Sequence, residues 1–107
     1  MTQRMTAAEA IAYIDAHESE KDFQQRVIAH ALPLGWVYYH TKDSRRSPAG
    51  FPDLVLVRDR IIYAELKTEK GRVSAKQGAW FCGLTRAGGE CYVWRPSQWP
   101  EIVSVLA

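Results

Sequence analysis

The sequence predicts an α/β domain in which a mixed sheet is flanked by helices, and three observations support this prediction. Apolar residues recur at helical spacing in two segments near the N-terminus. Four later segments are rich in aromatic and β-branched residues, as strands are. A helix-like segment separates the last two of these strands, and a connection of that length joins parallel strands. The expected order is helix, helix, three strands, helix, strand, helix.

Side chains that cap helices mark where the two N-terminal helices begin. Thr6 and Glu9 have the spacing of a capping box, and a first helix is expected from there to about His17. Ser19 opens a second helix, which ends near Pro33 and Gly35. Both helices therefore precede the first strand.

The rest of the chain alternates between strands and connections. Strands are expected at 36–40, 53–57, 61–67 and 90–95, with a polar loop at 41–50 and a tight turn at 58–60. A third helix begins at Ser74 and stops at Gly88. Its apolar stripe holds Trp80, Phe81 and Leu84, and a final short helix follows Pro96.

Length and composition bound the class of protein. The 107 residues fit a single domain spanning 1–107, and 47% hydrophobic residues suffice for a core. Cys82 and Cys91 form no zinc-type pattern with the three histidines. No signal peptide or membrane-spanning run is apparent, so we expect a cytoplasmic protein with no membrane partner.

Charged residues gather at one end of the predicted hairpin. Side chains alternate across a strand, so Tyr63, Glu65 and Lys67 share one face. The start of one strand in a hairpin lies beside the end of the next, which brings Asp53 near Glu65 and Lys67. Two carboxylates beside an ammonium group suit a hard cation such as Mg²⁺, and they suit phosphodiester hydrolysis. The alternative is that Asp53 only begins a strand and that Glu65 and Lys67 form a surface ion pair.

Several motifs in order resemble one nuclease family. The motif Gly50-Phe51-Pro52-Asp53, followed by Glu65-Leu66-Lys67, resembles the split signature of the PD-(D/E)XK nuclease superfamily. The segments 19–24, 39–40, 44–46, 53–56, 65–69 and 92–96, with Gln77 and Trp80, resemble the VRR-NUC (virus-type replication-repair nuclease) family. The resemblance extends from about Ser19 to the C-terminus. It implies a restriction-endonuclease-like αβββαβ core, which agrees with the order of elements expected above.

The resemblance also implies roles for individual residues. Asp53 and Glu65 match metal-binding acids, Lys67 matches the catalytic lysine, and Glu20 matches an acid on the first core helix. Gln77 matches a polar residue on the helix after the catalytic strand, and we expect the Leu66 carbonyl to assist in binding the metal. For Glu20, the alternative is an acid that only favours the start of a helix. For Gln77, the alternative is a capping box with Ser74.

These expectations define a metal-dependent DNA endonuclease that uses Mg²⁺ or Mn²⁺. Basic residues that would contact phosphates lie in the loops and at the start of the third helix: Arg45, Arg46, Lys70, Arg72 and Lys76. Branched DNA such as junctions or flaps is the expected substrate, in replication, recombination or repair. The family suggests a homodimer and a bacterial or phage source. The rival hypotheses are a DNA-binding module with a vestigial site and a protein-interaction module.

Overall fold

The computed structural model describes residues 4–41 and 48–107. Its α-helices are α1 (Ala7–His17), α2 (Glu20–Ala31), α3 (Ala75–Arg86) and α4 (Trp99–Leu106). Its strands are β1 (Val37–His40), β2 (Leu54–Val57), β3 (Ile61–Leu66) and β4 (Glu90–Trp94). Short 3₁₀ turns, η1 (Leu32–Leu34) and η2 (Pro96–Gln98), follow α2 and precede α4.

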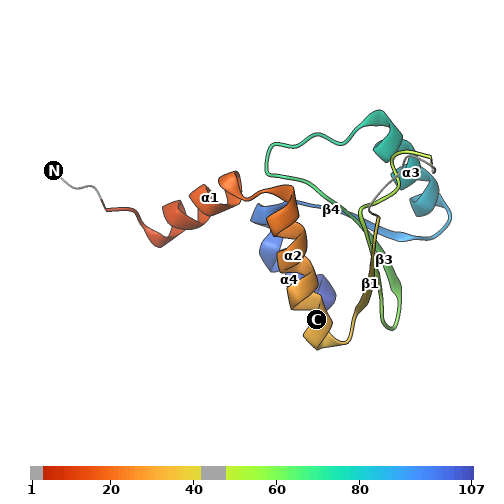
Figure 1. The fold of residues 1–107 in the computed structure, drawn as a ribbon, viewed down its shortest axis with the longest axis horizontal. Helices are drawn as coiled ribbons and strands as arrows, with labels where there is room; N and C mark the ends of the chain where they lie inside the picture. The colour runs from red at the N-terminus through yellow and green to blue at the C-terminus, as the bar shows by residue number, and fades with distance from the viewer. Residues whose placement is uncertain (1–3, 42–47) are drawn as a thin grey trace.

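The four strands form one mixed sheet in the order β1-β2-β3-β4. In Figure 1, α2 and α4 lie on one side of this sheet and α3 on the other. Strands β1, β2 and β3 are antiparallel neighbours, whereas β4 runs parallel to β3. Helix α3 makes the connection between the two parallel strands. The predicted α/β fold, with a mixed sheet flanked by helices, is confirmed.

The capping residues read from the sequence accept the expected hydrogen bonds. The Thr6 hydroxyl accepts from the Glu9 N–H, and the Ser19 hydroxyl accepts from the Asp22 N–H, each at 3.1 Å. These bonds satisfy backbone donors that the first turn of a helix leaves free. Gly35 ends η1 with a φ of 93°, a conformation that favours glycine.

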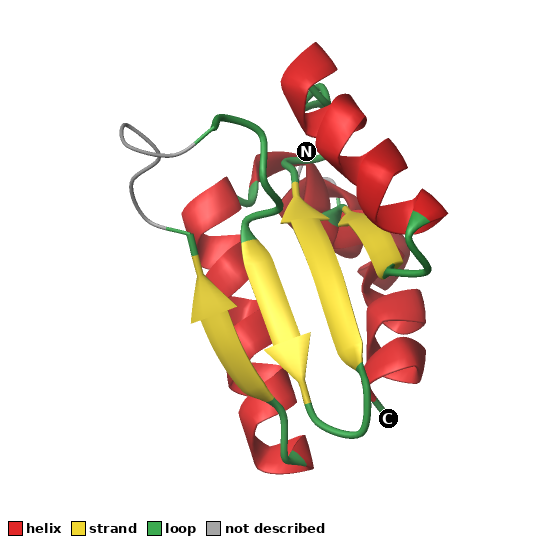
Figure 2. Cartoon of the chain, turned by 90° about the vertical axis from the view of Figure 1, so that its right-hand side faces the viewer, coloured by secondary structure: helices red, strands yellow, loops and turns green. Residues whose placement is uncertain are grey.

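One face of the sheet carries the core. Figure 2 looks onto the opposite face, with α2 and α4 behind the sheet. The buried apolar residues come from α2, α4, alternate strand positions and Trp36, which precedes β1: Phe23, Val27, Ala31, Trp36, Leu54, Leu56, Ile62, Ala64, Leu66, Trp94, Ile102 and Leu106. Their period of two along the strands is what a sheet covered on one side requires.

The other face is covered only in part. Trp80, Phe81 and Leu84, the predicted apolar stripe of α3, are half-buried, and none of them joins the core. Phe51 bridges this face and α3, with its ring centroid 5.2 Å from that of Trp80 and 6.2 Å from that of Tyr63. Helix α3 is therefore held by aromatic edges rather than by a second core.

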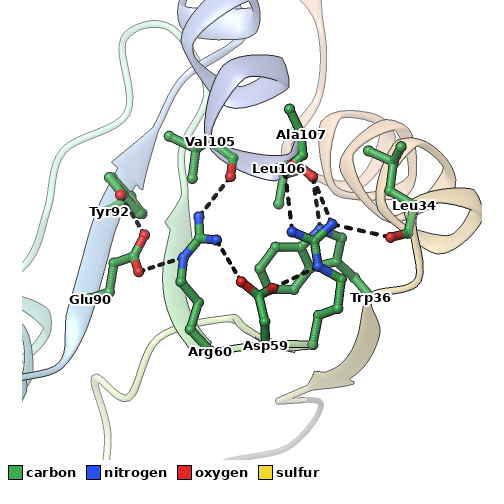
Figure 3. A network of polar contacts seen from close by, with 10 residues as sticks. Leu34, Trp36, Asp59, Arg60, Glu90, Tyr92, Val105, Leu106 and Ala107 are labelled. Carbon is green, nitrogen blue, oxygen red and sulfur yellow. Dashed lines mark hydrogen bonds and ion pairs between the residues drawn. The ribbon is translucent and has the colours of Figure 1, made fainter.

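The turn between β2 and β3 is tied to the end of α4 (Figure 3). Arg60 donates to the Val105 carbonyl and to Glu90, and Arg58 donates to the Leu106 carbonyl. The Trp36 indole N–H also donates to the Leu106 carbonyl, at 3.0 Å. These bonds cap α4 and hold the end of the hairpin that lies opposite Asp53.

Helix α1 projects from the body of the molecule (Figure 1). Ile11, Tyr13 and Ile14 on this helix are 60%, 56% and 60% exposed. Within residues 4–41 and 48–107, no helix has the length and apolar character needed to cross a membrane.

Candidate metal centre

Three carboxylates from three elements converge at one end of the sheet. Glu20 opens α2, Asp53 immediately precedes β2, and Glu65 lies near the end of β3. One oxygen of each lies within 4.8 Å of one oxygen of each of the others. The hairpin brings Asp53 beside Glu65 as predicted, and the packing of α2 on the sheet adds Glu20.

The β-sheet hydrogen bonding between β2 and β3 breaks at this point, and Pro52 is the reason. Continuing the register of Leu54 with Ala64 places Pro52 opposite Leu66. Pro52 has no N–H, so the Leu66 carbonyl loses the donor that this position would supply. The Leu66 N–H donates instead to Asp53 Oδ2 at 3.2 Å, and the Pro52 carbonyl accepts from Thr41 Oγ1. The break therefore orients Asp53 and leaves a backbone oxygen beside it.

Glu65 is an acidic side chain in the interior. It is only 2% exposed, and Gln77 Nε2 donates to its Oε1 at 2.9 Å. Lys67 Nζ lies 3.8 Å from the same oxygen. Burial, followed by the nearby Asp53 carboxylate, raises the pKa of Glu65 to about 8. The ionised carboxylate is therefore incompletely compensated by the protein alone.

Glu20 shares this electrostatic environment. Burial and the charge of Asp53 raise the pKa of Glu20 as well. Acids that crowd together and resist ionisation are those that a cation would stabilise. All the donors are oxygens, which are the ligands that hard divalent cations prefer. The residues present therefore fit a divalent metal ion.

Gln77 reaches Glu65 because α3 begins beside the loop that precedes Asp53. Its side-chain oxygen accepts from the Ser74 N–H at 2.9 Å, while the Ser74 hydroxyl accepts from the Gln77 N–H. Gly50 has a φ of 102°, and a Cβ there would lie 2.5 Å from the Lys76 carbonyl carbon. Only glycine allows this close approach. Gln77 therefore both caps α3 and contacts Glu65, and its role in catalysis stays a prediction.

The loop after Lys67 is held by a residue that the sequence analysis did not single out. Arg95 Nη1 donates to the carbonyls of Thr68 at 2.8 Å and Gly71 at 2.6 Å. Glu69 in the same loop accepts from the Ser97 N–H at 3.1 Å. The sequence does show an arginine directly after a predicted strand, which could have marked Arg95 as a structural residue. The strand pattern alone does not predict which loop the arginine side chain contacts.

The sequence profile of the VRR-NUC domain family matches residues 3–98. The chain belongs to the VRR-NUC family. Membership supports a nuclease that acts on DNA, and the acidic cluster is the part of the domain able to bind a divalent metal.

Solved structures agree on the fold. A VRR_NUC domain structure superposes with a TM-score of 0.67 at 21% identity, covering 79% of this chain and 94% of that one. The Holliday junction resolvase Hjc of Archaeoglobus fulgidus superposes with a TM-score of 0.52 at 24% identity, covering 66% of this chain and 62% of Hjc. At these identities the likeness concerns the fold. No curated protein matches the chain.

Three of the basic residues expected to meet phosphates belong to the described part of the chain, and they follow Lys67 in the sequence. Lys70 and Arg72 are exposed on the loop that Arg95 holds, and Lys76 is exposed in the first turn of α3. Arg45 and Arg46 lie outside the described residues. These three described side chains are therefore accessible to a ligand.

Proposed function

We propose that this VRR-NUC domain is an endonuclease that hydrolyses the DNA backbone with Mg²⁺ or Mn²⁺, and that it prefers branched DNA. The observation that carries the proposal is the cluster of Glu20, Asp53 and Glu65, whose oxygens lie within 4.8 Å of one another, with Lys67 beside it. These acids and the Leu66 carbonyl would hold the metal.

Each residue of the site has a distinct part in this proposal. Asp53 is oriented by the Leu66 N–H, and Gln77 fixes Glu65 by donating to Oε1. A bound divalent cation supplies a Lewis acid that neutralises phosphate charge and eases the ionisation of water. Lys67 carries an ammonium group on a side chain that is only 12% exposed. It holds the attacking water for in-line attack on phosphorus and stabilises the negative charge that develops.

The basic residues provide the contacts to the DNA backbone. Lys70, Arg72 and Lys76, together with Arg45 and Arg46 from the preceding loop, would neutralise phosphates on either side of the cleaved bond. Such contacts fix the position of the backbone without reading the sequence. This arrangement suits an enzyme that recognises the shape of DNA, which motivates the preference for junctions or flaps.

We also propose that the domain acts as a homodimer. Ile11 and Ile14 are each 60% exposed on the projecting helix α1, and a second copy would remove them from water. Two sites in one assembly would address two strands of a branched substrate. Light scattering at working concentration should give the dimer mass, and a monomer mass there would refute this part of the proposal.

Cleavage of labelled DNA tests the central proposal. Four-way junctions, flaps, duplexes and single strands are incubated with Mg²⁺, Mn²⁺ or EDTA. We expect metal-dependent cutting that Asp53→Asn and Lys67→Ala each reduce by at least about 100-fold. Asp59→Asn is the matched control, because Asp59 lies at the opposite end of the same hairpin. Undiminished cutting by Lys67→Ala would refute the assignment.

The same assay separates the two rival functions. A DNA-binding module with a vestigial site would bind the panel and cut none of it in either metal. A protein-interaction module would neither cut DNA nor show a heat of metal binding by calorimetry. The oxygen donors gathered at Glu20, Asp53 and Glu65 favour the nuclease over both.

A further inference from the structure

A groove beside the metal centre has no role in the mechanism above. Its volume is about 530 Å³, and it lies between α2 and β1. Glu20 and Asp53 form part of its wall. Any group that occupies the groove therefore lies next to two of the three acids.

The remaining lining has the chemistry of a nucleotide site. Lys21 supplies a positive charge for a phosphate, and Gln24 supplies an amide that can donate to and accept from a base edge. Tyr38 and His40 contribute aromatic rings, on which bases of any sequence stack. Tyr38 is 48% exposed, so its ring is available to a ligand.

We propose that this groove receives one unpaired nucleotide next to the phosphate that is cleaved. The proposal rests on the nuclease function proposed above and specifies its substrate. A volume of this size is typical of a small-ligand site, and a base held in a duplex cannot enter it without leaving the stack. The substrate class is therefore DNA that presents an unpaired nucleotide at the cleavage point, as branch points and flaps do.

Neighbouring residues on β1 provide a matched pair for the test. Alternation along the strand places Tyr38 toward α2, whereas Tyr39 lies on the opposite face of the sheet and does not line the groove. Tyr39 is 65% exposed. The change of Tyr38 to Ala removes the proposed stacking surface, Tyr38→Phe keeps it, and Tyr39→Ala removes a ring of the same size elsewhere.

The experiment compares two labelled duplexes that differ by one unpaired nucleotide at the mapped cleavage position. The wild-type protein should show the higher kcat/KM on the duplex with the unpaired nucleotide. Tyr38→Ala should lower that value by about fivefold or more, the usual effect of losing a stacked base, with little effect on the paired duplex. Tyr38→Phe and Tyr39→Ala should behave as the wild-type protein. Equal preference in Tyr38→Ala and wild type, or an equal loss in Tyr39→Ala, would overturn the proposal.

A binding measurement separates this proposal from the proposed function. 2-Aminopurine replaces the unpaired base, and its emission is read on binding to Lys67→Ala protein, without turnover. A change in emission that Tyr38→Ala abolishes supports the groove, and no change overturns it. Failure of the wild-type protein to cut any substrate would refute the nuclease proposal, while this binding result would still decide the role of the groove.

Discussion

The metal-free protein should lose stability as the pH rises from about 4.5 to about 8, because of Glu65. The pKa of Glu65 is raised from 4.5 to about 8 in the folded state. In that window the folded chain holds a proton that the unfolded chain releases. Deprotonation therefore favours unfolding, and the contribution of Glu65 to stability is present below 4.5 and is lost as the pH passes through 8.

The size of the effect follows from the width of that window. One proton per molecule gives a slope of at most about 1.4 kcal/mol per pH unit. Over the window of about 3.5 pH units the loss attributable to Glu65 is at most on the order of 5 kcal/mol, a large share of the stability of a small domain. A metal ion that binds the ionised acids should offset about half of this loss, by about 2.7 kcal/mol at a metal concentration 100 times the dissociation constant.

Urea unfolding at pH 5, 6.5 and 8, in EDTA and in Mg²⁺, measures this dependence. Glu65→Gln is the control, because a glutamine oxygen can still accept from Gln77 Nε2 but does not titrate in this range. In EDTA the stability of the wild-type protein should fall more steeply with pH than that of Glu65→Gln. Equal slopes for the two proteins would show that Glu65 ionises normally, and the electrostatic description of the site would then be wrong.

Three further substitutions test the contacts around the site. Gln77→Ala should weaken metal binding by about 10-fold in calorimetry, because Glu65 loses a charge-assisted hydrogen bond. Ser74→Ala is the control, because it removes only the helix cap and should leave the metal affinity unchanged. Arg95→Ala should raise the KM for DNA several-fold and leave the metal affinity unchanged, because the loop that carries Lys70 loses its hydrogen bonds to the Arg95 guanidinium group. An unchanged KM would exclude a role for Arg95 in positioning this loop. Pro52→Ala restores a backbone N–H opposite Leu66, where it can occupy the Leu66 carbonyl, and it should therefore lower the metal affinity by about fivefold in calorimetry. An unaltered affinity would remove the Leu66 carbonyl from the proposed ligands.

The parts of this molecule that local rules control were predictable from the sequence. Alternation and the short turn between β2 and β3 are sufficient to place Asp53 beside Glu65 and Lys67. The helix starts at Thr6, Ser19 and Ser74 follow from side chains that bond their own backbone neighbours. Each of these inferences depends on contacts only a few residues apart or on one short connection.

Contacts between distant elements were not predictable in the same way. The position of Glu20 at the acids came from the family resemblance, since the spacing of residues in α2 does not fix how the helix packs on the sheet. Arg95 bonds to carbonyls more than 20 residues away, and its sequence context gives no direction for its side chain. Trp80 is half-buried because the face of the sheet that α3 covers is only partly covered. An apolar stripe at helical spacing does not reveal how completely a helix covers a sheet. The single-domain organisation, spanning 1–107 with a core from about 19, remains a prediction.

The proline at the site connects the fold to the proposed chemistry. In a continuous strand pair, the backbone N–H and carbonyl groups of residues 52 and 66 would bond to one another, and the Leu66 carbonyl would not be available to a ligand. Pro52 cannot donate, so the pairing of β2 with β3 begins only at Leu54, one residue after Asp53, and the Leu66 N–H donates to the Asp53 carboxylate. The same interruption thus orients an acid and leaves the neutral Leu66 carbonyl oxygen without its partner on β2, and this oxygen carries no charge that would add to the repulsion between Asp53 and Glu65. A fourth carboxylate, placed on β3, would supply an oxygen as well, but it would raise the cost of ionising the cluster further. A backbone carbonyl is therefore the ligand that this crowded site can add at the lowest electrostatic cost.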